Sequence, residues 1–247
     1  MGGLVSPGSL VLVRHGQSTT NAAGVFTGWL DVPLTVRGRV EAVRAGRVLA
    51  THSVTPDVVH TSTLARTVTT AGLVLAPLAG HPPVHPDGRL DERHYGALTG
   101  RSKQVVRQEV GRVRFDDWRN SLITAPPPLT GRGLRELTEA GWPTDRLLST
   151  GVHAESLGDV VARVTPFWEQ VLRPGLVTGR TVLVVAHGNS LRALLVVLDR
   201  LTQEELSALR LPTGVVLRYR FTDALRPLVR GGQLLGPTPV HDGGAVF

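Results

Sequence analysis

Short apolar runs alternate with helix-like patterns along the chain. Three runs predict buried strands: residues 10–13, 58–59 with their neighbours, and 182–186. A fourth run, residues 215–221, alternates apolar residues with Arg and predicts a half-exposed edge strand. Apolar spacings of three and four predict helices over residues 35–50, 64–75, 156–172, 190–198 and 202–209. This order predicts an α/β fold with a mainly parallel central sheet flanked by helices, in which ligands bind at the carboxyl ends of the strands.

Two stretches interrupt the alternation. Residues 112–153 contain three consecutive prolines from Pro126, several glycines and little hydrophobic periodicity. Long irregular segments inside a compact domain are usually lids or binding insertions, so we expect a lid-like insertion over the strand ends. Residues 231–247 are rich in Gly and Pro and predict a mobile tail. With no domain boundary in view, we expect a single domain over residues 1–247.

The charge of the chain indicates an anionic partner. Of 247 residues, 41% are hydrophobic, and 27 Lys plus Arg outnumber 20 Asp plus Glu, for a formal net charge of +7. All the basic residues are Arg except Lys103, and they are scattered from Arg14 to Arg230 among acidic residues. A nucleic-acid surface would concentrate them, so we expect no nucleic-acid partner. The charge favours anions without specifying which.

The absence of cysteine excludes a disulfide framework, a thiolate metal site and a cysteine nucleophile. Residues 1–9 lack the charged start and apolar stretch of a signal peptide. No apolar run approaches the roughly 20 residues that a membrane span needs. We therefore expect a cytoplasmic protein with no membrane partner, whose nine histidines are the side chains that titrate near neutral pH.

Two strand ends share one layout. Residues 12–18 and 185–190 each run from apolar residues into His-Gly, then an amide, then Ser, with His15 in the first and His187 in the second. In a parallel sheet both histidines would stand at the carboxyl edge, where glycine lets backbone amides approach an anion. Two histidines also suit a metal ion, but Arg14 would repel a cation and no His-x-x-x-His spacing is present. The pair therefore favours an anion site.

Phosphate is the anion that these residue types suit best. Planar arginine donors match phosphate oxygens two at a time. A neutral imidazole attacks phosphorus when its second nitrogen is held as a donor, which gives a phosphohistidine. Fixed positive groups can meet the charge that develops on the phosphoryl oxygens without a metal. The two strand ends thus predict phosphoryl transfer through histidine.

Further motifs identify a family. They are Asn21, Phe26-Thr27-Gly28-Trp29, Pro33-Leu34-Thr35, Thr61-Ser62 with Arg66, Glu92-Arg93-His94-Tyr95-Gly96, His187-Gly188-Asn189-Ser190-Leu191-Arg192 and Pro212-Thr213-Gly214. With the first strand end, they closely resemble the cofactor-dependent phosphoglycerate mutases of the histidine phosphatase superfamily. The resemblance covers roughly residues 10–221 and implies the phosphoglycerate mutase-like fold. Arg-His-Gly marks only the superfamily, whereas Thr-Gly-Trp and Glu-Arg-His-Tyr-Gly are more specific to the mutase branch.

The resemblance implies a role for each matching residue. His15 would be the phosphorylated nucleophile, and His187 would stabilise the transferring phosphoryl group together with Arg14 and Arg66. Glu92 would carry protons to and from the substrate hydroxyl. The other matching residues would bind phosphate and substrate, beside Arg14, Arg66 and Glu92: Asn21, Thr27, Gly28, Arg93, His94, Tyr95, Lys103, Arg119, Gly188 and Asn189.

One binding position departs from the family. Trp118-Arg119-Asn120 stands where the family often has a pair of arginines after Trp. Replacing a guanidinium by an amide removes a charge-assisted contact worth about 1.5–3 kcal/mol. We therefore predict that Asn120 binds substrate with reduced strength.

By this resemblance the chain is an isomerase that interconverts 2-phosphoglycerate and 3-phosphoglycerate in glycolysis and gluconeogenesis. It would be primed at His15 by 2,3-bisphosphoglycerate, need no metal, bind a small phosphorylated hydroxy acid and form a homo-oligomer, a dimer or tetramer. The alternative is a histidine phosphatase that hydrolyses a small phosphate monoester, because a phosphohistidine that meets water is hydrolysed. A basic polyanion-binding module without activity is a third interpretation.

Overall fold

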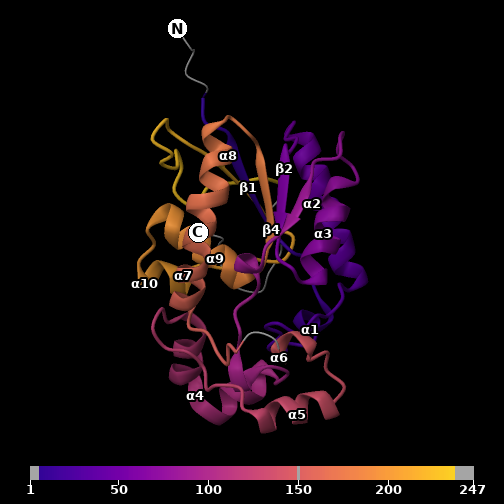
Figure 1. Cartoon of the computed structure of the whole chain (residues 1–247), viewed down its shortest axis with the longest axis vertical. Coiled ribbons are helices and arrows are strands. Elements are labelled where there is room, and N and C mark those ends of the chain that lie inside the picture. Colours follow the sequence, from indigo (N-terminus) through magenta and orange to yellow (C-terminus); the bar gives the residue numbers. More distant parts are fainter. Residues whose placement is uncertain (1–5, 149–150, 237–247) are drawn as a thin grey trace.

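A six-stranded sheet forms the centre of the computed structural model, which describes residues 6–148 and 151–236 (Figure 1). Its strands are β1 (Ser9–Arg14), β2 (Val58–Thr61), β3 (Val84–Pro86), β4 (Val182–Ala186), β5 (Val216–Arg220) and β6 (Gln233–Leu234). They lie in the order β3-β2-β4-β1-β5-β6, and the first four are parallel. β5 pairs antiparallel with β1, and β6 pairs antiparallel with β5. The predicted α/β fold with a mainly parallel sheet is confirmed.

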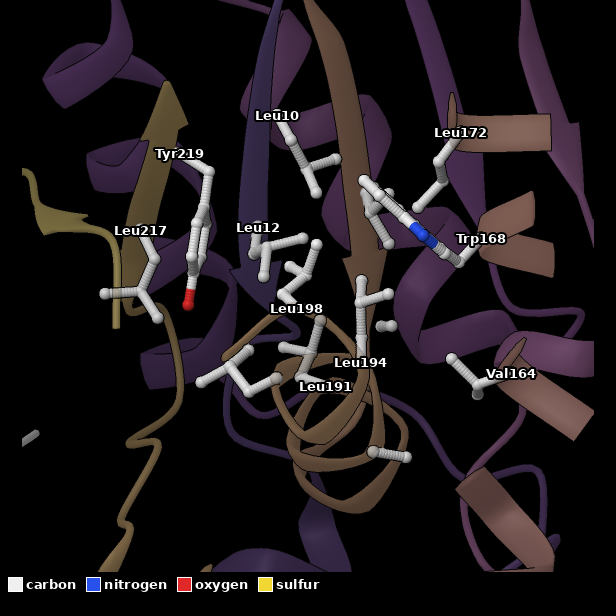
Figure 2. Close-up of a cluster of buried hydrophobic side chains, with 14 of the residues drawn as sticks. Leu10, Leu12, Val164, Trp168, Leu172, Leu191, Leu194, Leu198, Leu217 and Tyr219 are labelled. Carbon is white, nitrogen blue, oxygen red and sulfur yellow. The ribbon is translucent and has the colours of Figure 1, made fainter. Parts of the chain in front are cut away.

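Helices cover both faces of the sheet. On one face lie α2 (Val36–Thr51) and α3 (Ala65–Leu75), and on the other α7 (Leu157–Phe167), η3 (Trp168–Leu172), α8 (Arg173–Val177) and α9 (Gly188–Asp199) (Figure 1). Side chains alternate between the two cores: Val11 packs with the α2 and α3 face, whereas Leu10 and Leu12 pack with α7 and α9, as Figure 2 shows. Because β1 and β4 are buried on both faces, they read as continuous apolar runs.

The predicted helices are present with shifted ends. Thr35 and Ser156 cap α2 and α7, and α10 (Gln203–Ala208) follows the cap residue Thr202. The helix expected to end at residue 172 continues as far as Val177 through the π-helical turn η3. This turn follows Pro166, which cannot donate a backbone hydrogen bond inside the helix.

The predicted edge strand was wrong in part, and the predicted tail begins with a strand. Residues 215–221 contain β5, but β5 is not the edge, because β6 pairs with it. The alternation arises because Arg218 and Arg220 are more exposed than their neighbours. The predicted tail supplies β6, residues 237–247 lie outside the described residues, and the mobility of the tail stays a prediction. On the opposite edge, β3 escaped prediction because it is short and has no buried residue.

Residues 112–153 are more regular than expected. They contain the end of α4 (Lys103–Asn120), then α5 (Gly131–Glu139) and α6 (Asp145–Leu148). The apolar period of α4 is interrupted at Gly111, whose φ of 75° breaks the helix. In α5, none of the residues is fully buried, and only Leu134 and Leu137 pack against a core cluster, that of Trp29 and Leu30. Figure 1 shows α4, α5 and α6 gathered at one end of the molecule.

Three shorter helices join these layers: α1 (Thr19–Ala22), η1 (Gly88–Leu90) and η2 (Gly96–Leu98). The single-domain organisation and the lid function of the insertion stay predictions. The insertion does contact the carboxyl end of the sheet: Arg146 of α6 donates at 3.0 Å to the carbonyl of Thr63, which follows β2.

Candidate active site

His15 and His187 lie side by side after the neighbouring strands β1 and β4. These strands pair in parallel with Arg14 opposite Ala186, so both histidines reach the same edge of the sheet. The ring centroids are 4.9 Å apart, and the ring planes meet at 63°. Both side chains are buried. The structure thus brings together the two histidines that the sequence predicts as a pair.

The ring of His15 is held by its own loop. Nδ1 lies 2.7 Å from the carbonyl oxygen of Gly16, and because a carbonyl only accepts, Nδ1 carries the hydrogen. In the neutral ring, Nε2 then has a free lone pair. Burial, followed by the charges of Arg66 and Arg14, lowers the pKa of His15 well below its ordinary value of 6.5. His15 is therefore neutral near pH 7, with Nε2 as a nucleophile.

His187 is held by a side chain from another strand end. Its Nε2 lies 2.7 Å from the hydroxyl oxygen of Ser62, the residue after β2. Its Nδ1 is buried and has no hydrogen-bond partner within residues 6–148 and 151–236. Burial, followed by the charge of Arg66, lowers the pKa of His187 well below 6.5. Nδ1 is left for a ligand atom.

Arg14 and Arg66 are cations beside the histidines. Arg66, in α3, is 1% exposed and donates to the carbonyls of Leu30 and Gly28 at 2.9 Å each. Arg14 donates to the carbonyl of Leu211, while its Nε has no partner in the described part of the chain. Burial lowers the pKa of both, to about 10 for Arg66. Both stay charged near neutral pH, fixed by carbonyls and with N–H groups left for an anion.

Glu92 is buried opposite the start of α9. Its Oε1 accepts from the backbone N–H of Arg93 at 2.8 Å, and from the backbone and side-chain nitrogens of Asn189 at 3.3 and 2.9 Å. The same amide of Asn189 donates to the hydroxyl of Tyr95 at 2.8 Å. Gly188 begins α9, where free helix N–H groups favour an anion. One oxygen of Glu92 is therefore occupied, and none of the described residues donates to the other.

Arg93 and His94 differ in their surroundings. Arg93 donates to the carbonyl of Trp118 at 2.9 Å and stacks on the Tyr95 ring, 4.8 Å from its centre. His94 turns into the structure: its Nδ1 accepts from the backbone N–H of Gly96, and its ring lies 5.0 Å from that of Trp29. Burial lowers the pKa of His94 to about 4. The structure does not join His94 to the histidine pair.

Lys103 and Arg119 lie at the two ends of α4. Burial, followed by the charges of Arg119 and Arg14, lowers the pKa of Lys103 to about 8. Its ammonium nitrogen lies 5.9 Å from the ring centre of Phe26. Helix α4 therefore adds two cations to those beside the histidines.

Asn120 contacts an arginine that the sequence did not single out. Its side-chain oxygen accepts at 3.1 Å from Nη2 of Arg192, whose Nη1 donates to Oδ1 of Asn189 at 3.2 Å. Burial lowers the pKa of Arg192 to about 9. The amide at position 120 thus joins the end of α4 to α9, a contact that a second arginine could not make with Arg192.

Asn21, Thr27 and Gly28 follow His15 in the loop around α1. Oδ1 of Asn21 accepts from the backbone N–H of Ser18 at 3.1 Å, which is a helix cap. The hydroxyl of Thr27 is buried 2.5 Å from that of another threonine. Gly28 has a φ of 53°, which helps to aim its carbonyl at Arg66. These contacts position the loop, and only that of Gly28 reaches Arg66.

Sequence reasoning missed the roles of Ser62 and Arg192. Both lie within motifs quoted for the resemblance, yet neither was given a role. A hydroxyl that follows a strand and an arginine inside a helix carry no distinctive local pattern. Their partners, His187 and Asn189, are identified only by the folded chain.

No three His, Asp or Glu side chains among the described residues come together in an arrangement that could hold a metal ion. Among the helices of the described segments, none has the length and apolar content to cross a lipid bilayer.

Comparisons with known proteins agree with this geometry. Residues 10–140 and 132–231 match the model of the histidine phosphatase superfamily, branch 1. The 2,3-bisphosphoglycerate-dependent phosphoglycerate mutase of Mycobacterium tuberculosis is 46% identical over 243 residues, 98% of this chain and 97% of the relative. That of Mycobacterium leprae is 47% identical over 230 residues, 93% and 92% of the two chains. A solved mycobacterial glucosyl-3-phosphoglycerate phosphatase is similar at 26% identity, with a TM-score of 0.67 over 92% of this chain and 96% of that one.

Proposed function

The chain belongs to the histidine phosphatase superfamily and, within it, to the 2,3-bisphosphoglycerate-dependent phosphoglycerate mutases, and from this membership we propose that it interconverts 2- and 3-phosphoglycerate through a phosphohistidine at His15. The observation that carries the proposal is the hydrogen bond between Nδ1 of His15 and the carbonyl of Gly16. It leaves Nε2 as the nucleophile, next to His187.

His15 forms the covalent intermediate. The lone pair of Nε2 makes the N–P bond while the P–O bond of the donor breaks, and the leaving oxygen takes a proton. In the return step a substrate hydroxyl makes a new P–O bond, the N–P bond breaks, and the hydroxyl proton is released. Arg14, Arg66 and His187 meet the charge on the phosphoryl oxygens during both steps.

Glu92 moves the proton. Because Oε1 accepts three N–H groups, it is held as an acceptor and Oε2 is the oxygen that takes and returns the proton. Asn189 keeps this orientation, since its amide bonds both Glu92 and Tyr95. The same network fixes the proton carrier beside the phosphoryl site.

The residues fit a small polyanion. Three buried nitrogens have no hydrogen-bond partner in the described segments: Nε of Arg14, Nε of Arg93 and Nδ1 of His187. The charges of Arg119 and Arg14 lower the pKa of Lys103, so these cations lie close enough to share one anion. 2,3-Bisphosphoglycerate supplies the phosphoryl group that primes His15. The end of the ligand away from the histidines would be held by Lys103, Arg93, Tyr95, Arg119 and Asn120. Its phosphate would be held by Asn21, Thr27, Gly28, Gly188 and Asn189.

A histidine phosphatase is the second candidate. Asn120 stands where the family often has an arginine, so the substrate site has one cation fewer. One solved structure that is similar to this chain is a phosphatase. The decisive assay supplies 3-phosphoglycerate with a trace of 2,3-bisphosphoglycerate and follows 2-phosphoglycerate against free phosphate. We expect isomerisation to exceed phosphate release. Phosphate release that outruns isomerisation would assign the chain as a phosphatase.

Two controls complete the assay. Excess chelator should leave full activity, because arginines take the place of a metal; inactivation would indicate a metal-dependent hydrolase. Binding of nucleic acid without turnover would instead indicate a polyanion-binding module. Operation in the cytoplasm and assembly into a dimer or tetramer stay predictions of the resemblance.

A further inference from the structure

A chain of buried hydroxyl groups ends on His187. Ser62 and Thr67 are both 0% exposed. The Ser62 oxygen lies 2.7 Å from Nε2 of His187 and 2.7 Å from the hydroxyl oxygen of Thr67. The Thr67 oxygen lies 2.8 Å from the carbonyl of Leu64, and the backbone N–H of Leu64 donates to Ser62 at 3.2 Å. Each hydroxyl therefore has more contacts than hydrogens to give.

Counting hydrogens fixes which group donates in each of these hydrogen bonds. A hydroxyl has one hydrogen, and a carbonyl can only accept, so the hydrogen of Thr67 points to its carbonyl acceptors, Leu64 at 2.8 Å and Ser62 at 3.2 Å. Ser62 must then donate to Thr67. The remaining contact of Ser62 has to be donated by Nε2–H of His187.

The reverse direction is unfavourable. If Ser62 donated to His187, Thr67 would have to donate to Ser62. Two oxygens with no hydrogen between them, those of Thr67 and Leu64, would then face each other at 2.8 Å in a buried site. An unmade buried hydrogen bond costs about 1–3 kcal/mol.

We propose that Ser62 and Thr67 are positioning residues that hold neutral His187 as its Nε2–H tautomer, the opposite of the Nδ1–H tautomer of His15. Nδ1 of His187 then carries a lone pair in the resting protein. It donates to a phosphoryl oxygen only after the ring has taken up a proton from solvent. This last step rests on the proposed phosphoryl transfer, whereas the tautomer itself does not.

The charges around His187 agree with a neutral resting ring. Burial and the cationic groups Arg66, Arg14 and Arg163, together with His15, all lower its pKa. A phosphate dianion beside the ring would act in the opposite direction and favour proton uptake. The protonation of His187 is thereby coupled to the arrival of the group that it has to stabilise.

The direct test is nitrogen NMR on the ¹⁵N-histidine-labelled protein without ligand, with His187→Asn used to assign the ring. We expect the proton of His187 on Nε2 and that of His15 on Nδ1. With inorganic phosphate bound, His187 should carry protons on both nitrogens. A resting proton on Nδ1 of His187 would overturn the proposal, and the tautomer itself is read on the wild-type protein.

Variants of Thr67 supply a matched pair. Thr67→Val keeps the shape but removes the acceptor of Ser62, so Ser62 should turn to His187 and move its proton to Nδ1. Thr67→Ser keeps the hydroxyl and should keep the wild-type tautomer. If Thr67→Val leaves the proton on Nε2, the hydroxyl chain does not set the tautomer.

Ser62→Ala gives the kinetic counterpart. We expect the rate of phosphohistidine formation to fall by about tenfold to a hundredfold, with little change in KM, since the ring loses its alignment but the anion site stays. A rise in KM at unchanged kcat would show Ser62 to be merely structural. These readouts measure His187 in the resting protein and the rate of the first half-reaction. Their outcome therefore does not depend on whether the final product is an isomer or free phosphate, which the assay of the proposed function decides.

Discussion

The ends of β1 and β4 are similar in sequence and opposite in construction. Both run from an apolar strand into His-Gly, an amide and Ser. His15 is fixed by a backbone carbonyl of its own loop, whereas His187 is fixed by a hydroxyl that another strand end supplies. Every residue has a backbone carbonyl, so a side-chain substitution does not remove the hydrogen-bond partner of the nucleophile. The supporting histidine depends on side chains and is the more tunable partner.

The two glycines also differ. A Cβ at Gly16 would lie 2.0 Å from the carbonyl oxygen of Gly38, so the loop after β1 packs backbone to backbone against the start of α2. At Gly188 the nearest atom to a Cβ would be Cζ of Arg14, at 3.5 Å, which is ordinary contact. One glycine is required by close packing and the other is not.

The largest expected effect separates the roles of the histidines. His15→Ala should lower kcat by about 10⁴-fold or more and abolish the acid-labile phosphoryl label, because the nucleophile is gone. His187→Ala should lower kcat by about 10²- to 10³-fold, the cost of one stabilising donor, and still accept the label slowly. Label transfer and turnover measure both. Equal losses, or a label in His15→Ala, would contradict the division of roles.

The second prediction compares the glycines. Gly16→Ala should lower the free energy of unfolding by about 2 kcal/mol, because the backbone of Gly38 cannot move aside cheaply. Gly188→Ala should change it by no more than about 0.5 kcal/mol. Urea denaturation of both variants measures the difference. Similar midpoints would mean that the loop after β1 relaxes freely.

The smallest effect concerns a cation that contacts neither strand end. Lys103 has a pKa of about 8, lowered by burial, and its charged form exists below that pH. Because the substrate is anionic, kcat/KM should fall as the pH rises through about 8. Lys103→Arg stays charged, so this fall should disappear, while KM near pH 7 rises by about tenfold as the compact ammonium contact is lost.

The control for Lys103→Arg is the label on His15. Since the arginine does not touch the histidine pair, the label should form to the wild-type extent at saturating donor. Unchanged KM and an unchanged pH profile would show that the position of the only lysine in the chain has no consequence for binding.

Sequence patterns predicted the centre of the molecule better than its margins. Strands β1, β2 and β4 are buried and apolar, so their pattern is strong, and their shared direction places both histidines at one edge. The strands β3 and β6 are too short to leave a clear period, and α5 has only nine residues, of which Leu134 and Leu137 alone pack against a core cluster. Gly111 hides α4 in the same way, by breaking its period.

The candidate site divides similarly. The histidines and Arg14 follow from a local pattern, and Glu92 and Lys103 from the resemblance. Ser62 and Arg192 could not be predicted, because each acts through a partner that is distant in sequence. His94 shows the converse, since its motif is specific to the family but its contacts are those of a packed interior residue.

The parallel pairing of β1 with β4 has a consequence for how such enzymes diversify. Neighbouring strands lie about 4.8 Å apart whatever connects them, and the two histidine rings are 4.9 Å apart. Their spacing thus matches that of the sheet, while the whole insertion, residues 112–153, lies between β3 and β4. Descendants of this fold can lengthen, shorten or replace that insertion, and acquire new substrates, without rebuilding the pair that handles phosphorus.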